Sequence, residues 1–201
     1  DEVRLFSRDM MQGPVAVNGV RIGMPICEDA WYPDVVEALE ESGAEFILVP
    51  NGSPYFRNKF ETRLNHMVGR VVEARLPLIY LNMVGGQDDQ VFDGGSFVLN
   101  PDASPAVQLP LFDEAISHVD LERTDQGWQA AKGDFATHPD EFEQDYRVMV
   151  EALRDYMRKT GFSKVLLGLS GGIDSAIVAT IAADALGPDN VRCVMLPSEY
   201  T

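Results

Sequence analysis

The amino-acid sequence predicts an α/β protein. Apolar runs with the length of strands alternate with amphipathic segments of helical period, and turns rich in Gly and Pro separate them. A Gly-rich turn late in the chain joins an expected strand to an expected helix. Apolar residues make up 45% and charged residues 24% of the 201 residues, which is an ordinary globular balance. At ~100–200 residues per domain, the length allows one domain or two small ones.

The first hundred residues contain alternating strand and helix patterns. The segment 20–26 is apolar apart from Arg21, which is typical of a buried strand. Pro33 suits the first turn of a helix, and Gly43 can end it. In chain order, we expect strands over 20–26, 45–49, 78–84 and 94–99 and helices over 33–42 and 60–74. The expected apolar helix faces are Val35, Val36 and Leu39 in the first helix and Leu64, Met67, Val68, Val71 and Val72 in the second.

The second hundred residues contain a break in the pattern and then further elements. Residues 121–140 are rich in polar residues, Gly and Pro and show weak periodicity, so we interpret them as a linker or surface excursion. A helix is expected from Glu141 to Gly161, then a strand over 164–169, a helix over 174–186 and a strand over 191–196. The expected apolar face of the first helix is Phe142, Tyr146, Met149, Val150, Leu153 and Tyr156.

The chain is strongly acidic, with 16 Lys and Arg against 32 Asp and Glu and a formal net charge of −16. This balance argues against a nucleic-acid surface, because Lys and Arg dominate binding to the phosphate backbone. It does not exclude a nucleotide, which backbone N–H groups at a helix start can hold. No apolar run approaches the ~18–20 residues of a transmembrane helix. The first residues lack the basic and apolar regions of a signal peptide.

The cysteines and histidines give no metal or disulfide framework. Cys27 and Cys193 lie in different settings, so a reducing cytoplasm is the default location. Cys193 lies within an expected strand, where we expect it to pack in the core. His66, His118 and His138 have no partner at ligand spacing, which argues against a zinc site.

The turn Ser170-Gly171-Gly172-Ile173-Asp174-Ser175 lies between an expected strand and an expected helix. Its glycines allow a sharp turn that brings backbone N–H groups close to a ligand, and the helix start adds partial positive charge. Ser170 and Ser175 can donate to phosphate oxygens, and Asp174 can hold Mg²⁺ against a pyrophosphate. The structural alternative is a tight turn in which Asp174 or Ser175 caps the helix. The turn matches neither a Walker P-loop nor a dinucleotide fingerprint.

The full string resembles the S-G-G-x-D-S pyrophosphate loop of the ATP pyrophosphatase family at every defined position. Members of that family cleave ATP to AMP and pyrophosphate while they activate an acid as its adenylate. The resemblance therefore implies ATP as a co-substrate and Mg²⁺. The residues that it implies for ATP and pyrophosphate binding are Gly168, Ser170, Gly171, Gly172, Asp174 and Ser175, with Asp174 as the Mg²⁺ contact.

Cys27 lies where an expected strand ends and the chain turns, in Met24-Pro25-Ile26-Cys27-Glu28-Asp29. This is a common place for a nucleophile, and a nearby helix start favours the thiolate, whereas Glu28 and Asp29 oppose it. The structural alternative for Cys27 is a small buried hydrophobe.

Three segments resemble the nitrilase, or carbon–nitrogen hydrolase, superfamily, and its glutaminase members most of all. They are Pro25-Ile26-Cys27-Glu28-Asp29, Pro50-Asn51-Gly52-Ser53-Pro54-Tyr55 and Leu81-Asn82-Met83-Val84-Gly85-Gly86-Gln87-Asp88. In that family a Cys attacks the amide, a Glu acts as general base and acid, and a Lys stabilises the oxyanion. The resemblance transfers only the nucleophile, Cys27, because the family's Glu and Lys both precede the Cys and every lysine here follows it. It also implies that Glu28, Ser53 and Lys59 contact glutamine, although Ser53 alternatively serves the turn and Lys59 the solvated surface.

A nitrilase-like segment followed by an S-G-G-x-D-S loop on one chain resembles the glutamine-dependent NAD⁺ synthetase family. This combination implies the C-terminal part of a nitrilase-like α-β-β-α sandwich, followed by the start of a Rossmann-like parallel-sheet ATP pyrophosphatase domain. The implied domains are residues 1–122, a linker over 123–140, and residues 141–201. The segment 195–201 resembles the family's Met-Pro-Ser segment at the ATP site, with Leu196 in place of the usual Met.

The implied activity is the amidation of deamido-NAD⁺ to NAD⁺ through an adenylate, with glutamine as the source of ammonia. The implied substrates are glutamine, ATP and deamido-NAD⁺, and the implied assembly is a cytoplasmic homo-oligomer without a nucleic-acid or membrane partner. The chain begins without Met and stops directly after a strand-like run. We therefore expect a fragment of a longer enzyme, inactive on its own.

Three alternatives remain open. The first is a different glutamine-dependent ligase with a pyrophosphatase loop, which would carry an unrelated glutaminase domain. The second is a truncated, non-catalytic fragment that binds a nucleotide or a partner subunit. The third is a plain nitrilase-family amidase, whose activity would not depend on ATP.

Overall fold

The structure is a computed structural model that describes Leu5 and residues 11–195. In chain order, its elements are β1 (Val15–Val17), β2 (Val20–Gly23), the 3₁₀ helix η2 (Cys27–Trp31), α1 (Pro33–Glu41), β3 (Phe46–Asn51), α2 (Lys59–Ala74), β4 (Leu78–Asn82), β5 (Val84–Gln87), β6 (Gln90–Asp93), β7 (Phe97–Leu99), β8 (Pro105–Gln108), β9 (Leu121–Thr124), β10 (Gly127–Ala130), α3 (Glu141–Thr160), β11 (Val165–Leu169), α4 (Ile173–Leu186), the 3₁₀ helix η3 (Pro188–Asn190) and β12 (Val191–Met195). None of the helices in this part of the chain has the length and hydropathy needed to cross a membrane.

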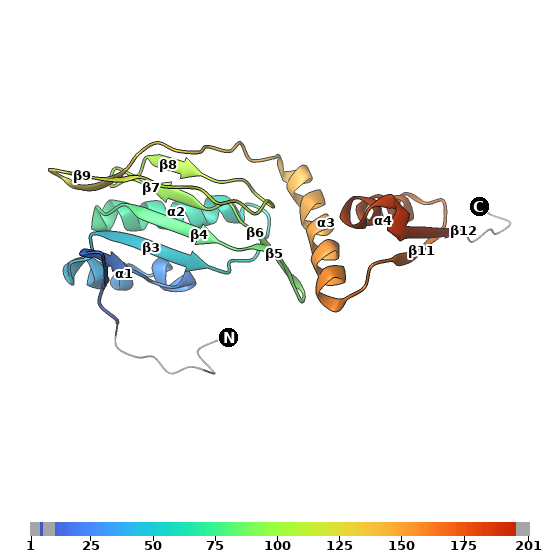
Figure 1. Cartoon of the computed structure of the whole chain (residues 1–201), viewed down its shortest axis with the longest axis horizontal. Coiled ribbons are helices and arrows are strands. Elements are labelled where there is room, and N and C mark those ends of the chain that lie inside the picture. Colours follow the sequence, from blue (N-terminus) through green and yellow to red (C-terminus); the bar gives the residue numbers. More distant parts are fainter. Residues whose placement is uncertain (1–4, 6–10, 196–201) are drawn as a thin grey trace.

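A six-stranded sheet in the order β1-β2-β3-β4-β7-β8 forms the larger region (Figure 1). The three strands β2, β3 and β4 run parallel, whereas β1, β7 and β8 add antiparallel strands at the two sides. Parallel neighbours need crossover connections, and α1 and α2 are those crossovers. The loops after β2, β3 and β4 therefore leave the sheet at the same edge, where ligand sites of α/β folds form.

The two faces of this sheet carry separate cores, because successive strand residues point to opposite faces. Helices α1 and α2 pack on one face, around Val36, Leu39, Ile47, Val49, Met67, Val71, Leu78 and Tyr80. The other face carries a smaller buried cluster of Val98, Ala106, Val107 and Ala130. The helix-covered face is thus the one with a deep core, and it also buries the polar groups of the candidate site.

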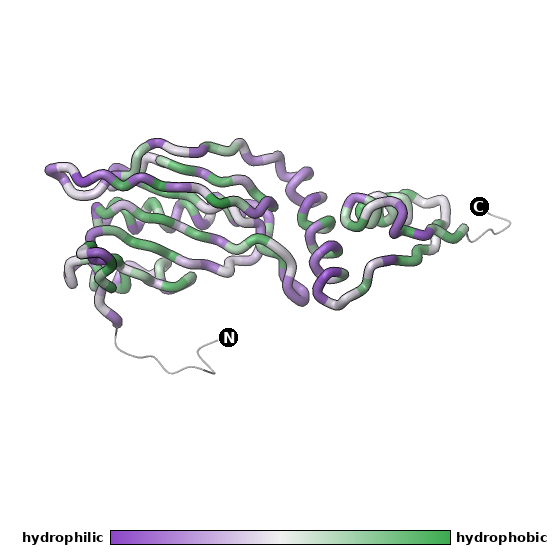
Figure 2. The backbone as a smooth tube through the Cα atoms, viewed as in Figure 1, coloured by the Kyte–Doolittle hydropathy of each residue, from purple (hydrophilic) through white to green (hydrophobic). Residues whose placement is uncertain are grey.

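Helix α3 lies between the sheet region and a small C-terminal unit (Figure 1). In that unit β11 and β12 pair parallel, and α4 connects them. The backbone is mostly hydrophobic along β3 and β4 and mostly hydrophilic along α3 (Figure 2). The chain thus has two αβ regions that differ greatly in size, joined by one long polar helix.

The α/β class and the helices predicted over 33–42, 60–74, 141–161 and 174–186 are confirmed within a residue or two. Three predicted strands are shorter than expected. The first ends at Gly23, because Pro25 and the turn into η2 interrupt it. The strand predicted over 78–84 divides into β4 and β5, and the strand predicted over 94–99 starts only at Phe97, after two glycines with positive φ. The domain boundaries 1–122, 123–140 and 141–201 remain predictions.

Residues 121–140, interpreted from the sequence as a linker or surface excursion, contain regular structure in their first half. Strands β9 and β10 form a hairpin there, and Gly127 adopts a φ of 106° at the turn. The indole N–H of Trp128 donates to Glu45 at 3.0 Å and ties the hairpin to the start of β3. The chain then runs along β8, where the Gln108 N–H donates to the Asp134 carbonyl at 2.9 Å. Short polar strands with weak alternation gave no clear sequence signal for this hairpin.

The predicted helix faces need correction at a few positions. Val72 of α2 is exposed, and so are Phe142, Met149 and Tyr156 of α3. The buried side of α3 instead carries Val150, Glu151, Asp155 and Met157. Hydrophobic period alone could not identify this side, because two of its members are acidic: Asp155 accepts from Gly86 of the β5–β6 hairpin, and Glu151 pairs with Arg154 of the same helix. Cys193, expected in the core, is exposed on β12.

Candidate active site

Cys27 is the first residue of η2, directly after the chain leaves the sheet at the end of β2. Its φ is +52°, a left-handed conformation that side chains other than Gly rarely adopt. The turn is fixed by Asp29, whose backbone N–H donates to the Ile26 carbonyl at 3.1 Å, while its carboxylate accepts from the Ile26 N–H at 3.3 Å. Cys27 remains half-buried. Strained backbone of this kind gathers at sites of chemistry, and here it presents a thiol.

Lys59, the first residue of α2, is 9% exposed, so the prediction of a binding lysine fits its burial better than the alternative of a solvated surface lysine. Its ammonium lies 4.6 Å from the ring centre of Trp31 and 4.3 Å from that of Phe56. Burial lowers the pKa of Lys59, and the positive charge of Arg63 lowers it further. The neighbouring Cys27 and Glu28 act in the opposite direction. The aromatic rings thus hold one ammonium within electrostatic reach of Cys27.

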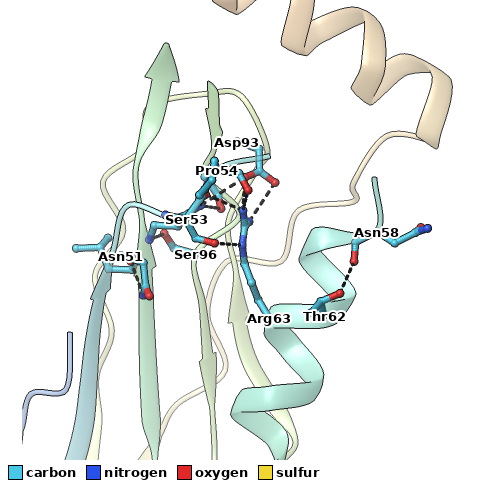
Figure 3. Close-up of polar contacts among 11 residues, drawn as sticks. Asn51, Ser53, Pro54, Asn58, Thr62, Arg63, Asp93 and Ser96 are labelled. Atoms are coloured by element: carbon cyan, nitrogen blue, oxygen red, sulfur yellow. Dashed lines mark hydrogen bonds and ion pairs between the residues drawn. The ribbon is translucent and has the colours of Figure 1, made fainter. Parts of the chain in front are cut away.

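Ser53 follows the end of β3 and is 4% exposed. Its backbone N–H donates to the Asn82 side-chain oxygen at 2.9 Å, which attaches the loop after β3 to the end of β4. Its hydroxyl oxygen accepts from Arg63 Nε at 3.1 Å (Figure 3). Ser53 is therefore held through both its backbone and its side chain, which is more than an ordinary turn residue needs.

The side chain that holds Ser53 belongs to a buried ion pair. Arg63 of α2 is 0% exposed, and its guanidinium meets Asp93 of β6 at 2.7 Å (Figure 3). Asn82 also donates to the Gly94 carbonyl at 3.1 Å and so fixes the chain just after Asp93. Four elements thus converge on one polar network: the loop after β3, the end of β4, β6 and α2.

Sequence analysis did not single out Arg63 or Asp93. A signal was present, since the four buried residues of α2 are spaced every four positions: Lys59, Arg63, Met67 and Val71. Lys59 and Arg63 lie on the same helix face as the core residues Met67 and Val71. This spacing indicates a buried face that is polar at its N-terminal end. Asp93, by contrast, ends β6 directly before two glycines, where an acidic residue is unremarkable, so only the fold identifies it as the partner.

Tyr80 adds a buried hydroxyl behind this network. The side chain is 0% exposed and stacks on Phe97 with ring centres 4.8 Å apart. Burial raises the pKa of Tyr80 to about 12, while the nearby Arg63 charge and Ser53 hydroxyl lower it. The Tyr80 hydroxyl has no hydrogen-bond partner within the described part of the chain.

The loop that carries Ser53 continues into a contact with α3. The Tyr55 hydroxyl donates to Asp145 at 2.9 Å, and the Arg57 guanidinium pairs with both Asp145 and Glu141. Burial and the Asp145 contact raise the pKa of Tyr55 to about 12. The helix that leads towards the C-terminal unit therefore binds the same loop that positions Ser53.

A second contact joins α3 to the β5–β6 hairpin. The Asp155 carboxylate accepts from the Gly86 N–H at 2.9 Å, and the Lys159 ammonium donates to the Gly86 carbonyl. A Cβ at Gly85, whose φ is +119°, would lie 2.7 Å from the Asp155 carboxylate oxygen. Glycine is thus required for the helix to approach this closely.

The second predicted site is the turn between β11 and α4. The hydroxyl oxygens of Ser170 and Ser175 lie 3.1 Å apart, and the Ser175 hydroxyl donates to the Gly172 carbonyl at 2.9 Å. Gly171 has a φ of +84°, which explains glycine at that position. Gly172 is the N-cap residue of α4 and offers no side chain to cap the helix. No side chain of the N-cap residue therefore accepts from the first N–H groups of α4, and these groups can donate to a ligand.

Asp174 is exposed in the first turn of α4. Within the described residues no group of three or more His, Cys, Asp or Glu side chains could hold a metal ion by itself. A single carboxylate fits Mg²⁺ that takes its remaining ligands from phosphate oxygens and water, as Mg²⁺ usually does with nucleotides.

The structure thus brings the predicted residues into two groups. Cys27, Glu28, Ser53 and Lys59 gather at the carboxyl edge of the large sheet, whereas Gly168, Ser170, Gly171, Gly172, Asp174 and Ser175 form the turn of the C-terminal unit. Leu196 lies outside the described residues. A separate cavity of about 250 Å³ has a mostly apolar lining that includes Ile79, Leu81, Val98 and Val107, and it contains none of these side chains.

Two family profiles match the chain. One described as carbon–nitrogen hydrolase matches residues 1–128, and one described as NAD synthase matches residues 145–201. Residues 129–144 separate the two matches and include the first four residues of α3. The first match contains the Cys27 group and the second contains the glycine-rich turn.

Alignments with individual relatives cover the whole chain. A glutamine-dependent NAD(+) synthetase of Rhodobacter capsulatus is 61% identical over all 201 residues, which cover 36% of that protein. The Acinetobacter baylyi protein of the same description is 41% identical, with 37% of its length covered. A solved structure of glutamine-dependent NAD+ synthetase from Acinetobacter baumannii in complex with ADP superimposes with a TM-score of 0.91 at 37% identity, covering the whole chain and 38% of that structure. The chain therefore spans little more than a third of the relatives that it matches.

Proposed function

The chain belongs to the carbon–nitrogen hydrolase family, and we propose that it forms part of a glutamine-dependent NAD⁺ synthetase. The observation that carries the proposal is the pairing of two unrelated sites on one chain. A strained Cys27 lies beside a buried lysine at one, and an uncapped Ser-Gly-Gly turn opens α4 at the other. A plain amidase would need only the first site, and a plain nucleotide binder only the second.

At the first site Cys27 would attack the side-chain amide carbon of glutamine. Expulsion of ammonia leaves a thioester, and water then releases glutamate and restores the thiol. The Lys59 ammonium, the Ser53 hydroxyl and Glu28 are the groups that would bind the polar parts of glutamine, because all three lie in the same neighbourhood as Cys27. In the proposed reaction the family's Glu and Lys, which precede the nucleophile in sequence, complete the site.

At the second site ATP would transfer its AMP portion to the nicotinate carboxylate of deamido-NAD⁺. Backbone N–H groups at the start of α4 and the hydroxyls of Ser170 and Ser175 would bind the departing pyrophosphate. Asp174 would hold Mg²⁺, which neutralises phosphate charge when bound. Ammonia from the first site would then displace AMP and give NAD⁺.

The proposal also covers the cellular location and the partners of the enzyme. Both cysteines of the chain are free thiols, as suits a reducing cytoplasm. The assembly would be a homo-oligomer, and neither nucleic acid nor membrane would be a partner, because the net charge of −16 opposes binding to anionic surfaces.

The test is NAD⁺ formation by the full-length protein with glutamine or with ammonia as nitrogen donor. Cys27→Ala should lower the glutamine-dependent rate by about 1,000-fold or more and leave the ammonia-dependent rate intact, because it removes only the nucleophile. Asp174→Ala should lower both rates. Cys193→Ala, at the exposed second thiol, is the matched control and should change neither.

Three results would refute the proposal. Retention of glutamine use by Cys27→Ala would remove the nucleophile from the mechanism. Amide hydrolysis without any ATP-dependent NAD⁺ formation would identify a plain amidase, and ATP binding without turnover would identify a binding fragment.

A further inference from the structure

The hydrogen bonds of Arg63 converge on one short segment next to Cys27. The guanidinium is fully buried and is held against Asp93 through two nitrogens, at 2.7 and 3.1 Å. It also donates to the loop after β3: the Ser53 hydroxyl oxygen accepts at 3.1 Å, the Ser53 carbonyl at 2.8 Å and the Pro54 carbonyl at 3.2 Å (Figure 3). Arg63 therefore orients this loop and the Ser53 side chain together.

The direction of these hydrogen bonds follows from the chemistry of the groups. A guanidinium only donates, so the Ser53 oxygen must accept from Arg63. The Ser53 backbone N–H is already used by Asn82, and the Ser53 carbonyl accepts from both Arg63 and Asn82. The hydrogen of the Ser53 hydroxyl is therefore the group at this residue that remains for another acceptor.

Arg63 and Ser53 lie on elements that are close to the proposed nucleophile, Cys27. Arg63 lies one helical turn after Lys59 on the same buried face of α2. The Tyr80 hydroxyl, which has no hydrogen-bond partner within the described residues, shares the electrostatic neighbourhood of Ser53 and Cys27. Arg63 thus fixes the Ser53 oxygen on the loop that follows β3, and β3 itself contacts η2, which begins at Cys27.

We propose that Arg63 is a positioning residue that makes the Ser53 hydroxyl a hydrogen-bond donor to an acceptor oxygen of glutamine. Asp93 holds the guanidinium plane in place, and Arg63 polarises the hydroxyl through Nε. The inference rests on the proposed function, in that glutamine is the occupant of the site. It assigns a role in substrate binding to a residue that cannot itself touch the substrate, because it is fully buried.

A purely structural role accounts less well for the arrangement. A buried ion pair is weak evidence for a stabilising role, because well-packed apolar residues can often replace the pair without loss of folding stability. An ion pair with Asp93 also does not require a donor directed at the Ser53 hydroxyl. The bond from Nε to that hydroxyl is the part of the network that the proposal explains.

Arg63→Lys in the full-length protein tests the proposal. Lysine keeps a positive charge for Asp93, but its single ammonium cannot reproduce the planar fork that reaches Asp93 and Ser53 together. The KM for glutamine should rise about ten-fold, while the ammonia-dependent rate stays within about two-fold of the parent. Arg75→Lys, the same change at the exposed end of α2, is the matched control and should alter neither value.

A double-mutant cycle with Ser53→Ala separates positioning from structure. Ser53→Ala alone should raise the KM for glutamine about ten-fold, and adding Arg63→Lys should then raise it no further. An unchanged KM in Ser53→Ala would overturn the proposal even if Arg63→Lys failed to fold. An equal KM increase from Arg63→Lys in both backgrounds would also overturn it. Glutamine use that survives Cys27→Ala would instead overturn the proposed function.

Discussion

The sheet region, residues 11–139, and the C-terminal unit, residues 161–195, carry their chemistry in opposite ways. In the first, Ser53 and Arg63 are buried at 4% and 0% exposure and are held by side chains from distant parts of the chain. In the second, Ile173 and Leu166 are 79% and 71% exposed, and the Ser170–Ser175 turn is held by its own hydroxyls and backbone.

The difference shows how each site is built. The Ser-Gly-Gly turn needs only a strand, two glycines and a helix start, all within a few residues, so its geometry forms without a deep core. The Cys27 neighbourhood needs β2, β3, β4, β6 and α2 to be packed correctly before its polar groups meet. Mutations should therefore have large effects on stability in the first region and small effects in the second.

The largest effect is expected from Asp93→Ala. This change leaves the buried Arg63 guanidinium without its carboxylate, and removing one partner of a buried pair typically costs about 3–5 kcal/mol. Denaturant unfolding can be followed through the fluorescence of Trp31 and Trp128, both of which lie in the sheet region.

Asp174→Ala is the matched control for that experiment, because it removes an exposed carboxylate from the C-terminal unit. It should change the free energy of unfolding by no more than about 0.5 kcal/mol. Equal costs for the two substitutions would abolish the distinction between a site built by packing and a site built locally.

The same distinction explains what could be predicted from the sequence. The glycine-rich turn and its flanking strand and helix follow from local pattern, and the structure places β11, the turn and α4 as expected. Cys27 and Ser53 were found through short motifs, but Arg63 and Asp93 were not, because their pairing joins residues thirty positions apart. The polar face of α3 was missed for a similar reason: Asp155 is buried only because Gly86 approaches it from the β5–β6 hairpin.

A second comparison uses apolar residues of the two regions. Met67 is 0% exposed within the core under α2, so Met67→Ala should cost about 2–5 kcal/mol through lost burial and a cavity. Ile173→Ala, at 79% exposure on α4, should cost no more than about 0.5 kcal/mol in this chain. Unfolding midpoints in denaturant measure both.

The comparison becomes sharper when the same two variants are made in the full-length protein. The cost of Met67→Ala should stay the same, whereas that of Ile173→Ala should rise if further segments of the NAD synthase domain cover α4. A low cost for Met67→Ala in either protein would contradict the core assigned to the sheet region.

The smallest effect concerns α3, whose Asp155 and Asp145 carboxylates hold it against the sheet region. Burial raises the pKa of Asp155, but the Gly86 N–H, Lys159 and Arg158 outweigh it, so the pKa lies below its usual 3.8. Hydrogen bonds from Arg57 and Tyr55 likewise lower the pKa of Asp145. A carboxyl with a lowered pKa in the folded state stabilises that state above pH 3.8 and loses this contribution as the pH falls through the lowered value.

The packing of α3 against the hairpin should therefore be constant from neutral pH down to about pH 4 and weaken below it. Asp155→Asn keeps an acceptor oxygen for the Gly86 N–H but removes the charge, so hydrogen exchange of α3 should depend less on pH in that acid range. Asp125→Asn, at an exposed residue of the β9–β10 turn, is the control and should keep the dependence of the parent. An unchanged acid response in Asp155→Asn would mean that other contacts hold α3, and that the joint between the regions does not depend on this carboxylate.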